Sequence, residues 1–150
     1  MLYIKEIKPI SFFYFRTKTT VNELAGFFPV GQQLLKEAVQ LSVFVTGPVH
    51  WHYFGMTDIN RPFTLEIAIP VGEIPKNYDG EFHFKRTESF KCISLVHEGA
   101  WTEMPQRYGQ IMEYMNAHQL TPLGMHRELY INADFHHPEA NTTEIQFGIE

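Results

Sequence analysis

The chain has 150 residues, of which 44% are hydrophobic and 19% are charged, and its formal net charge at pH 7 is −5. This composition predicts one folded domain and excludes an intrinsically disordered chain. The negative charge argues against broad binding to a nucleic-acid backbone, which requires a basic surface, and no helix-turn-helix carries such a surface. We therefore expect no direct binding to DNA.

We expect a soluble cytoplasmic protein. Lys5, Glu6 and Lys8 precede any apolar run, unlike the start of a signal peptide. No apolar stretch approaches the roughly 20 residues that a membrane helix requires, so no membrane partner is expected. Cys92 is the only cysteine, which excludes an intrachain disulfide.

The first half of the sequence predicts a strand, a helical region and two further strands. Residues 2–16 alternate and then become apolar, as in a buried strand. Apolar residues at helical spacing over 24–41 predict two helical segments. They are divided near Pro29, because proline lacks an N–H group and clashes with the preceding turn. Residues 49–54 and 63–71 are expected to pair as a hairpin.

The second half predicts the same order of elements. Residues 90–97 read as a strand, and residues 102–118 read as a helix with one apolar side. Two more strands are expected near 126–132 and 142–149. Between the halves, residues 72–89 contain glycine, proline, asparagine and aspartate, which predict a connector.

Two segments far apart in the sequence place a glutamate at the same point of an apolar strand. These are Glu66 within residues 63–70 and Glu144 within residues 141–148. A glycine precedes a tyrosine at equal spacing in both halves, as Gly47 precedes Tyr53 and Gly124 precedes Tyr130. The pattern indicates a duplicated unit.

We therefore expect a single domain over residues 1–150. Its first repeat would span about 2–71, its connector about 72–89 and its second repeat about 90–150. The predicted fold is α+β, in which duplicated β-α-β-β units form a curved antiparallel sheet, with the helices on one face and a ligand cleft on the other.

Alternation along the strands predicts which side chains line the cleft. Leu65 and Ile67 are expected to face the helices and Glu66 to face away from them. The same alternation on the other strands predicts that the face opposite the helices carries Glu144, Trp51, Tyr53, Glu128 and Tyr130. Such an acidic and aromatic cleft predicts a pocket for a small molecule, in particular a cation.

The histidines do not predict a metal site. His50 and His52 share a strand face, and His136 and His137 lie in a loop. A metal ion would need further ligands converging from elsewhere, and no HExxH motif or cysteine pair supplies them. We expect neither a metal nor a cofactor.

Several short motifs occur in an order and spacing that cover nearly the whole chain. They are residues 22–29, Gly47-Pro48, Tyr53 and 66–71 in the first half, and 97–101, Tyr108, Gly124, 130–132 and 143–145 in the second. Together they resemble the GyrI-like family, which includes the effector-binding domains of bacterial multidrug-responsive transcription activators. Unlike those activators, this chain is expected to act without a DNA-binding domain.

The resemblance implies a duplicated β-α-β-β fold and a pocket for lipophilic, often cationic, molecules. It implies that Glu144 is the acidic centre of the pocket and that Tyr130 corresponds to a pocket tyrosine. Trp101 stands where many relatives carry tyrosine. The remaining candidates for contact with a ligand are Tyr108, Tyr53 and Glu66.

The leading hypothesis is a non-enzymatic protein that binds hydrophobic or cationic compounds. Burial of Glu144 as a free anion would be costly, and a bound cation would restore its charged form. Aromatic rings such as those of Tyr130, Trp101 and Tyr53 would each add a cation–π contribution of ~0.5–2 kcal/mol.

Three alternatives stay open. By the resemblance, the protein could hydrolyse reactive cyclopropane-bearing toxins, with Glu144 activating water and Tyr130 supplying a proton. It could instead act through its surface on a protein partner, either a transcription regulator or gyrase. A haem-binding role is suggested only by folds of similar duplicated layout.

Overall fold

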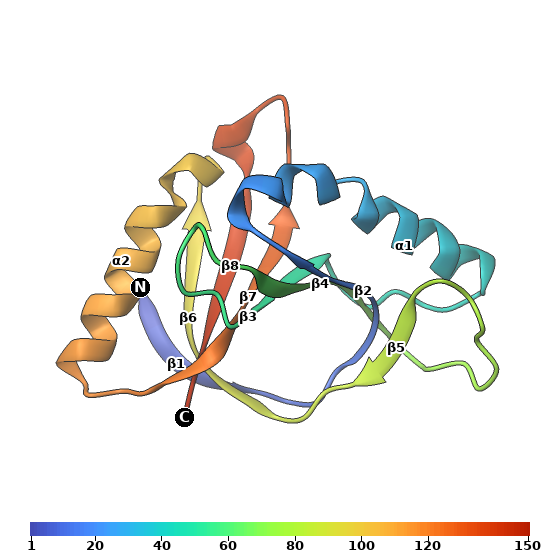
Figure 1. The fold of residues 1–150 in the computed structure, drawn as a ribbon, viewed down its shortest axis with the longest axis horizontal. Helices are drawn as coiled ribbons and strands as arrows, with labels where there is room; N and C mark the ends of the chain where they lie inside the picture. The colour runs from blue at the N-terminus through green and yellow to red at the C-terminus, as the bar shows by residue number, and fades with distance from the viewer.

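The computed structural model describes residues 1–150 as one curved antiparallel sheet with two α-helices (Figure 1). The strands are β1 (Leu2–Ile7), β2 (Ser11–Thr19), β3 (His50–Phe54), β4 (Phe63–Val71), β5 (His83–Arg86), β6 (Phe90–Glu98), β7 (Pro122–Asn132) and β8 (Thr142–Ile149). The helices are α1 (Val30–Gln40) and α2 (Met104–Ala117), with 3-10 turns η1 (Val21–Phe27), η2 (Trp101–Glu103) and η3 (Pro138–Ala140). Neither α-helix is long and apolar enough to cross a membrane.

The eight strands lie in the order β1-β6-β8-β7-β3-β4-β2-β5. This arrangement confirms the predicted α+β fold. The order strand, helix, strand, strand occurs in β2-α1-β3-β4 and again in β6-α2-β7-β8. β7 and β3 meet in the middle of the sheet, where Trp51 lies opposite Glu128. The residue boundaries proposed for the two repeats stay a prediction.

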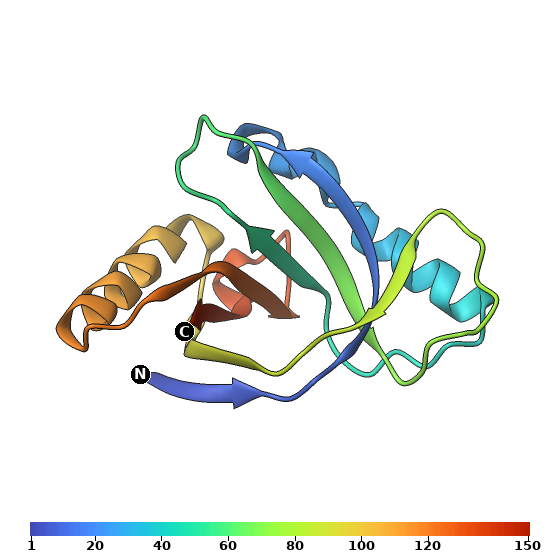
Figure 2. The ribbon, with the colours of Figure 1, turned by 60° about the horizontal axis from the view of Figure 1, so that its bottom comes forward.

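The predicted first strand over residues 2–16 is wrong, because the structure has two strands there. Pro9 cannot donate to a strand ladder, and it lies between β1 and β2. β1 pairs with β6, whereas β2 pairs with β4 and β5. The linkers that follow β1 and β5 run side by side (Figure 2), since the Thr87 N–H donates to the Ile10 carbonyl at 2.8 Å.

Both α-helices pack on the same face of the sheet, here called the helix face (Figure 1). On α1, Leu34 and Ala38 are one helical turn apart, and both are completely buried against β2 and β4 residues such as Phe13 and Ile67. On α2, Ile111 packs with Met104, Met115 and the β6 and β8 residues Ile93 and Ile145. Full burial of one such aliphatic side chain contributes about 1.5–3 kcal/mol.

The opposite face, here called the inner face, is buried without a helix over it. The contacts of Arg127 on β7 show how this face is covered. Its guanidinium carbon lies 5.6 Å from the ring centre of Phe12 on β2 and 4.3 Å from that of Phe90 on β6. These strands lie on opposite sides of β7 in the sheet and are not its neighbours. The sheet therefore curves around the inner face and brings side chains of distant strands into contact.

Candidate ligand-binding site

Three tyrosines donate hydrogen bonds to one carboxylate on the helix face. Tyr130 donates to Glu128 Oε1 at 2.6 Å, and Tyr53 donates to the same oxygen at 3.3 Å. Tyr108 donates to Glu128 Oε2 at 2.5 Å. We call these four residues the tyrosine cage. Both oxygens of the carboxylate thus have hydroxyl partners.

The sheet register brings the cage together. Glu128 and Tyr130 are two residues apart on β7, so their side chains leave the same face of the sheet. β3 pairs with β7 and places Tyr53 opposite His126 and Trp51 opposite Glu128. Tyr108 comes from α2, which packs on this face. The cage therefore combines the two central strands with the second helix.

Four further aromatic side chains lie beside the cage. Trp51 and Trp101 contact the Tyr130 ring edge to face, at centroid distances of 6.1 and 5.7 Å. Phe28 lies 5.7 Å from Trp51, and Phe135 lies 5.5 Å from Trp101. Phe28 and Phe135 also contact each other at 5.7 Å. An unbroken series of rings thus leads from the molecular surface to Glu128.

The outer members of this series are exposed to solvent. Phe28 is 48% exposed and Phe135 is 63% exposed. Phe28 lies in the turn between η1 and α1, and Phe135 lies in the loop between β7 and η3. Trp101 is held more firmly, because its indole Nε1–H donates to Thr143 Oγ1 at 3.1 Å. We call Phe28, Phe135, Trp51 and Trp101 the aromatic rim.

The cage tyrosines keep their protons. Burial raises the pKa of Tyr53, Tyr108 and Tyr130 well above the usual value, and the charge of Glu128 raises it further. His126 stacks on Tyr53 at 4.7 Å, and burial lowers its pKa to about 4, so it is neutral at pH 7. The hydroxyls remain hydrogen-bond donors to the carboxylate.

No cationic side chain neutralises Glu128. The ion pairs of the structure involve other carboxylates, and none joins a lysine, arginine or histidine nitrogen to Glu128. Neutral hydroxyl dipoles and aromatic rings surround it instead. A half-buried carboxylate in such surroundings is complementary to a ligand that brings its own positive charge.

The predicted arrangement of faces is wrong for the aromatic residues. Trp51 lies opposite Ile67 in the β3–β4 ladder, and Tyr53 lies opposite Leu65. Residues directly opposite in a ladder share a face, so these aromatic side chains lie on the helix face. The cage and the aromatic rim are on the side of the sheet that carries the helices.

Glu144 does not lie with Tyr130 and Trp101, which corrects the expected grouping of these side chains. It lies on the inner face, where Lys5 Nζ is 2.7 Å from its Oε2. Ser94 Oγ donates to the same oxygen at 2.8 Å and Gln146 Nε2 donates to it at 3.1 Å. Glu144 is therefore already neutralised by a residue of the edge strand β1.

Glu66 has an equivalent position in the first half of the sheet. It lies on the inner face, where its Oε1 is 2.6 Å from Lys85 Nζ and its Oε2 is 3.5 Å from Arg16 Nη1. Lys85 belongs to β5, the opposite edge strand. Of the six predicted ligand contacts, the structure thus brings together Tyr53, Tyr108, Tyr130 and Trp101, and it places Glu66 and Glu144 elsewhere. Contact of any of the six with a ligand stays a prediction.

The environment of Glu144 predicts how the stability of the fold depends on pH. Burial alone would raise its pKa, but hydrogen bonds from Lys5, Gln146 and Ser94 and the charge of Lys5 outweigh burial and hold the pKa below 4.5. A carboxylate with a depressed pKa stabilises the fold above its unfolded pKa, and this contribution is lost as the pH falls through the folded value.

We therefore expect Glu144→Gln to lower the free energy of unfolding at pH 7, and the difference from wild type to shrink progressively below pH 4.5. Urea unfolding at pH 7, 4.5 and 3.5 measures this difference. An equal difference at all three pH values would show that the ionised form of Glu144 does not stabilise the fold.

Sequence reasoning did not include Glu128 or the two exposed rim residues, Phe28 and Phe135, among the candidates for ligand contact. The spacing of Glu128 could have identified it, because residues two positions apart in a strand point to the same face and Glu128 is two positions before Tyr130. The signal for Phe28 and Phe135 was weaker, since an isolated phenylalanine in a turn is equally compatible with packing against the core. Only the register and the connections bring Phe28 and Phe135 into contact with Trp51 and Trp101.

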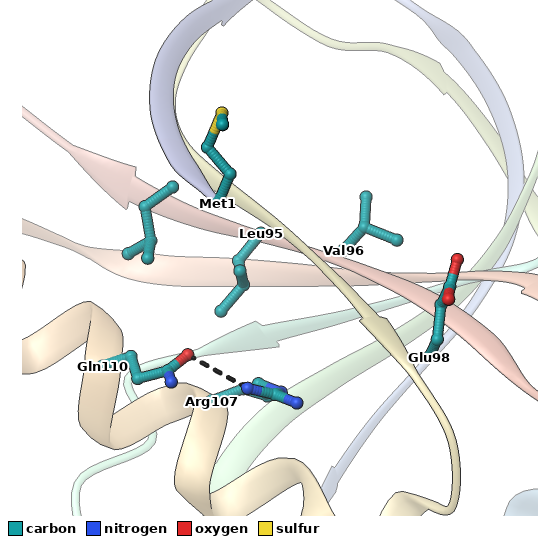
Figure 3. Close-up of a pocket in the computed structure, with 7 residues that line it drawn as sticks. Met1, Leu95, Val96, Glu98, Arg107 and Gln110 are labelled. Carbon is teal, nitrogen blue, oxygen red and sulfur yellow. Dashed lines mark hydrogen bonds between the residues drawn. The ribbon is translucent and has the colours of Figure 1, made fainter. Parts of the chain in front are cut away.

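A surface hollow elsewhere has different chemistry. It has a volume of about 510 Å³ and lies between α2 and the β1 edge of the sheet (Figure 3). Its lining residues are Met1, Leu2, Leu95, Val96, Glu98, Arg107 and Gln110, none of which is aromatic. Arg107 is also engaged, because it donates to Gln110 Oε1 at 3.4 Å and to His97 Nδ1 at 3.0 Å. This hollow has no aromatic rings, and its one carboxylate, Glu98, is exposed to solvent and not enclosed by hydroxyl donors.

Comparison with protein families gives a match over residues 2–150. The matching family is described as a GyrI-like small molecule binding domain. A search of curated protein sequences found no match.

Three solved structures illustrate the likeness of fold. The C-terminal domain of EcmrR superposes with a TM-score of 0.84 at 19% sequence identity, covering 100% of this chain and 97% of that one. SAV2435 bound to tetraphenylphosphonium gives a TM-score of 0.67 at 16% identity, covering 100% and 94%. A hydrolase from Listeria innocua superposes with a TM-score of 0.64 at 12% sequence identity, covering 99% of this chain and 91% of that one. At these identities the likeness is one of fold.

Proposed function

This chain belongs to the GyrI-like family of small-molecule-binding domains, and we propose that it binds lipophilic cations between Glu128 and the aromatic rim. One observation carries the proposal. Glu128 accepts hydrogen bonds from three tyrosines but has no cationic partner within the protein. A ligand with a delocalised positive charge supplies the missing partner.

The physical balance favours a cation that is large and weakly hydrated. Such a cation loses little hydration when it leaves water, whereas a compact ammonium ion loses much more. A unit charge 4 Å from the carboxylate gains roughly 4 kcal/mol at an effective dielectric constant of about 20. Each ring of the cage or rim that faces the charge adds ~0.5–2 kcal/mol.

The aromatic rim favours ligands with rings of their own. Phe28 and Phe135 expose apolar surface at the outer end of the site, and Trp51 and Trp101 lie between them and Tyr130. Rings packed against these side chains would remove apolar area from water and gain about 25 cal/mol per Å². SAV2435, which shares the fold, is described as bound to tetraphenylphosphonium, a cation of this type.

The raised pKa values of the tyrosines favour binding over hydrolysis. Burial and the charge of Glu128 raise the pKa of Tyr108 and Tyr130 well above the usual value, which makes their hydroxyls poor proton donors to a leaving group. The hydrolase from Listeria innocua shares the fold with this chain at 12% identity. The proposal also includes a cytoplasmic location. It further includes a protein partner, either a transcription regulator or gyrase.

Titration with tetraphenylphosphonium tests the proposed function. Quenching of Trp51 and Trp101 fluorescence reports binding, and triphenylphosphine oxide serves as a neutral control with similar rings. We expect a dissociation constant in the micromolar range, which corresponds to about −8 kcal/mol, and binding of the neutral compound at least about 10-fold weaker. Equal affinities for both compounds, or no binding of either, would contradict the proposal.

A further inference from the structure

The inner face contains a buried cation that no anion of the protein neutralises. Glu144 pairs with Lys5 at 2.7 Å, and Glu66 pairs with Lys85 at 2.6 Å and with Arg16. Arg127 is only 2% exposed and takes part in no ion pair. Both buried carboxylates of this face are therefore already engaged by other cations.

The Arg127 guanidinium also lacks hydrogen-bond acceptors. Its Nε and Nη1 atoms are buried, and neither has a partner. The rings of Phe90 and Phe12 lie 4.3 and 5.6 Å from the guanidinium carbon, which provides partial cation–π compensation. Rings accept no conventional hydrogen bond, however, and a buried donor without an acceptor is costly, above all on a charged group.

The charge of Glu66 acts on Arg127 only from a distance, since Glu66 forms its ion pairs with Lys85 and Arg16. The other titratable groups near Arg127 are neutral. His50 and His52 contact each other at 3.1 Å between ring nitrogens. Burial, together with the charge of Arg127, lowers the pKa of His50 to about 3 and that of His52 well below its usual value, so both are neutral. Burial raises the pKa of Cys92 to about 11, so its thiol stays protonated.

A buried acceptor without a hydrogen-bond partner lies on the strand next to Arg127. Gln146 is the direct cross-strand neighbour of Arg127 on β8, and its Oε1 is buried without a partner. Its Nε2 is occupied by the hydrogen bond to Glu144. A direct contact between Gln146 Oε1 and Arg127 is not formed, so the two groups leave both a donor and an acceptor unsatisfied in the same part of the inner face.

We propose that the inner face binds a small monovalent anion, of the size of chloride, bromide or formate, on the Nε and Nη1 groups of Arg127. The anion supplies the charge and the acceptor that Arg127 lacks. A water molecule that donates to both the anion and Gln146 Oε1 satisfies the remaining orphaned atom. The site is separate from the tyrosine cage, because Arg127 and Glu128 are adjacent on β7 and point to opposite faces.

Bromide tests the site directly in crystals of the full chain. Crystals grown in sodium bromide are expected to show an anomalous scattering peak within hydrogen-bonding distance of Arg127 Nε or Nη1. Crystals of Arg127→Met, in which the long apolar stem is kept and the charge is removed, are expected to lack that peak. Wild-type density that fits water and carries no anomalous signal would overturn the proposal in favour of hydration of the guanidinium.

Thermal unfolding gives an independent readout in solution. At constant ionic strength, with gluconate as the balancing anion, replacement by bromide should raise the Tm of the wild type by about 4 °C for each tenfold increase above the dissociation constant. Arg127→Met should show no such dependence. A wild-type Tm that does not change with bromide, or an equal rise in both proteins, would contradict a specific site. If the variant does not fold, the wild-type anomalous map decides alone.

Discussion

Glu128→Gln is expected to weaken tetraphenylphosphonium binding by about 100-fold, which corresponds to about 2.7 kcal/mol. The substitution keeps the size of the side chain and one acceptor oxygen but removes the charge that attracts the ligand. It also places an amide N–H₂ group among the hydroxyls of Tyr53, Tyr108 and Tyr130, where Glu128 accepts three hydrogen bonds. Loss of one member of a half-buried charge pair typically costs about 2–5 kcal/mol.

Glu144→Gln is the matched control for this experiment. It removes the same charge by the same chemical change, but from the inner face, where Glu144 pairs with Lys5. Isothermal titration of the three proteins should give affinities for wild type and Glu144→Gln within about threefold of each other. The reverse result, in which Glu144→Gln loses binding and Glu128→Gln keeps it, would place the site on the inner face.

Gly148→Ala is expected to destabilise the fold by about 3 kcal/mol. A Cβ atom at Gly148 would lie 2.5 Å from the Met125 carbonyl oxygen, 2.9 Å from Phe90 Cε2 and 3.1 Å from Leu123 Cβ. The pairing of β7 with β8 shifts register between Pro122 and His126, which brings this part of β7 close to Gly148. Because the first of these contacts is with backbone, the strand itself must move to accommodate a methyl group.

Gly109→Ala provides the opposite expectation within the same protein. Gly109 lies on α2, and a Cβ there would meet no atom within 4 Å. Alanine in place of a helical glycine should stabilise the fold by roughly 0.5–1 kcal/mol. Urea unfolding of both variants at pH 7 measures the two effects. A small effect of Gly148→Ala would show that β7 can move away from β8 at little cost.

Much of the fold was predictable from periodicity and from turn residues. The strand expected over residues 63–71 coincides with β4, and the helix expected over 102–118 contains α2. Both have strong apolar patterns and clear boundaries. The short β5 had no comparable signal, because it has four residues and only partial burial. It forms because β2 offers it an open edge, which is a tertiary effect.

The faces of the strands were not predictable with the same certainty. The assignment depends on register, and an error of one residue in a strand transfers every side chain to the other face. The residues between β3 and β4, from Gly55 to Pro62, give no indication of which residues pair. The sequence pattern therefore groups Trp51 and Tyr53 with Glu66, whereas in the structure they share a face with Ile67 and Leu65.

The duplicated glutamates lie away from the aromatic residues with which the sequence grouped them. Glu66 and Glu144 each pair with a lysine on an edge strand, Lys85 on β5 and Lys5 on β1. Their shared pattern thus reflects equivalent ion pairs on the inner face. At the centre of the helix face the two halves differ, since Trp51 of β3 lies opposite Glu128 of β7. A comparison that searched for identical residues in both halves could not find the tyrosine cage, which depends on this difference.

The most direct test of the proposed site is a crystal structure with tetraphenylarsonium, whose arsenic atom marks the positive centre by anomalous scattering. The proposal predicts an arsenic peak beside the Glu128 carboxylate, with the phenyl rings packed against Trp51, Trp101, Phe28 and Phe135. A peak on the inner face near Glu144 and Lys5, or in the hollow lined by Arg107 and Gln110, would contradict it.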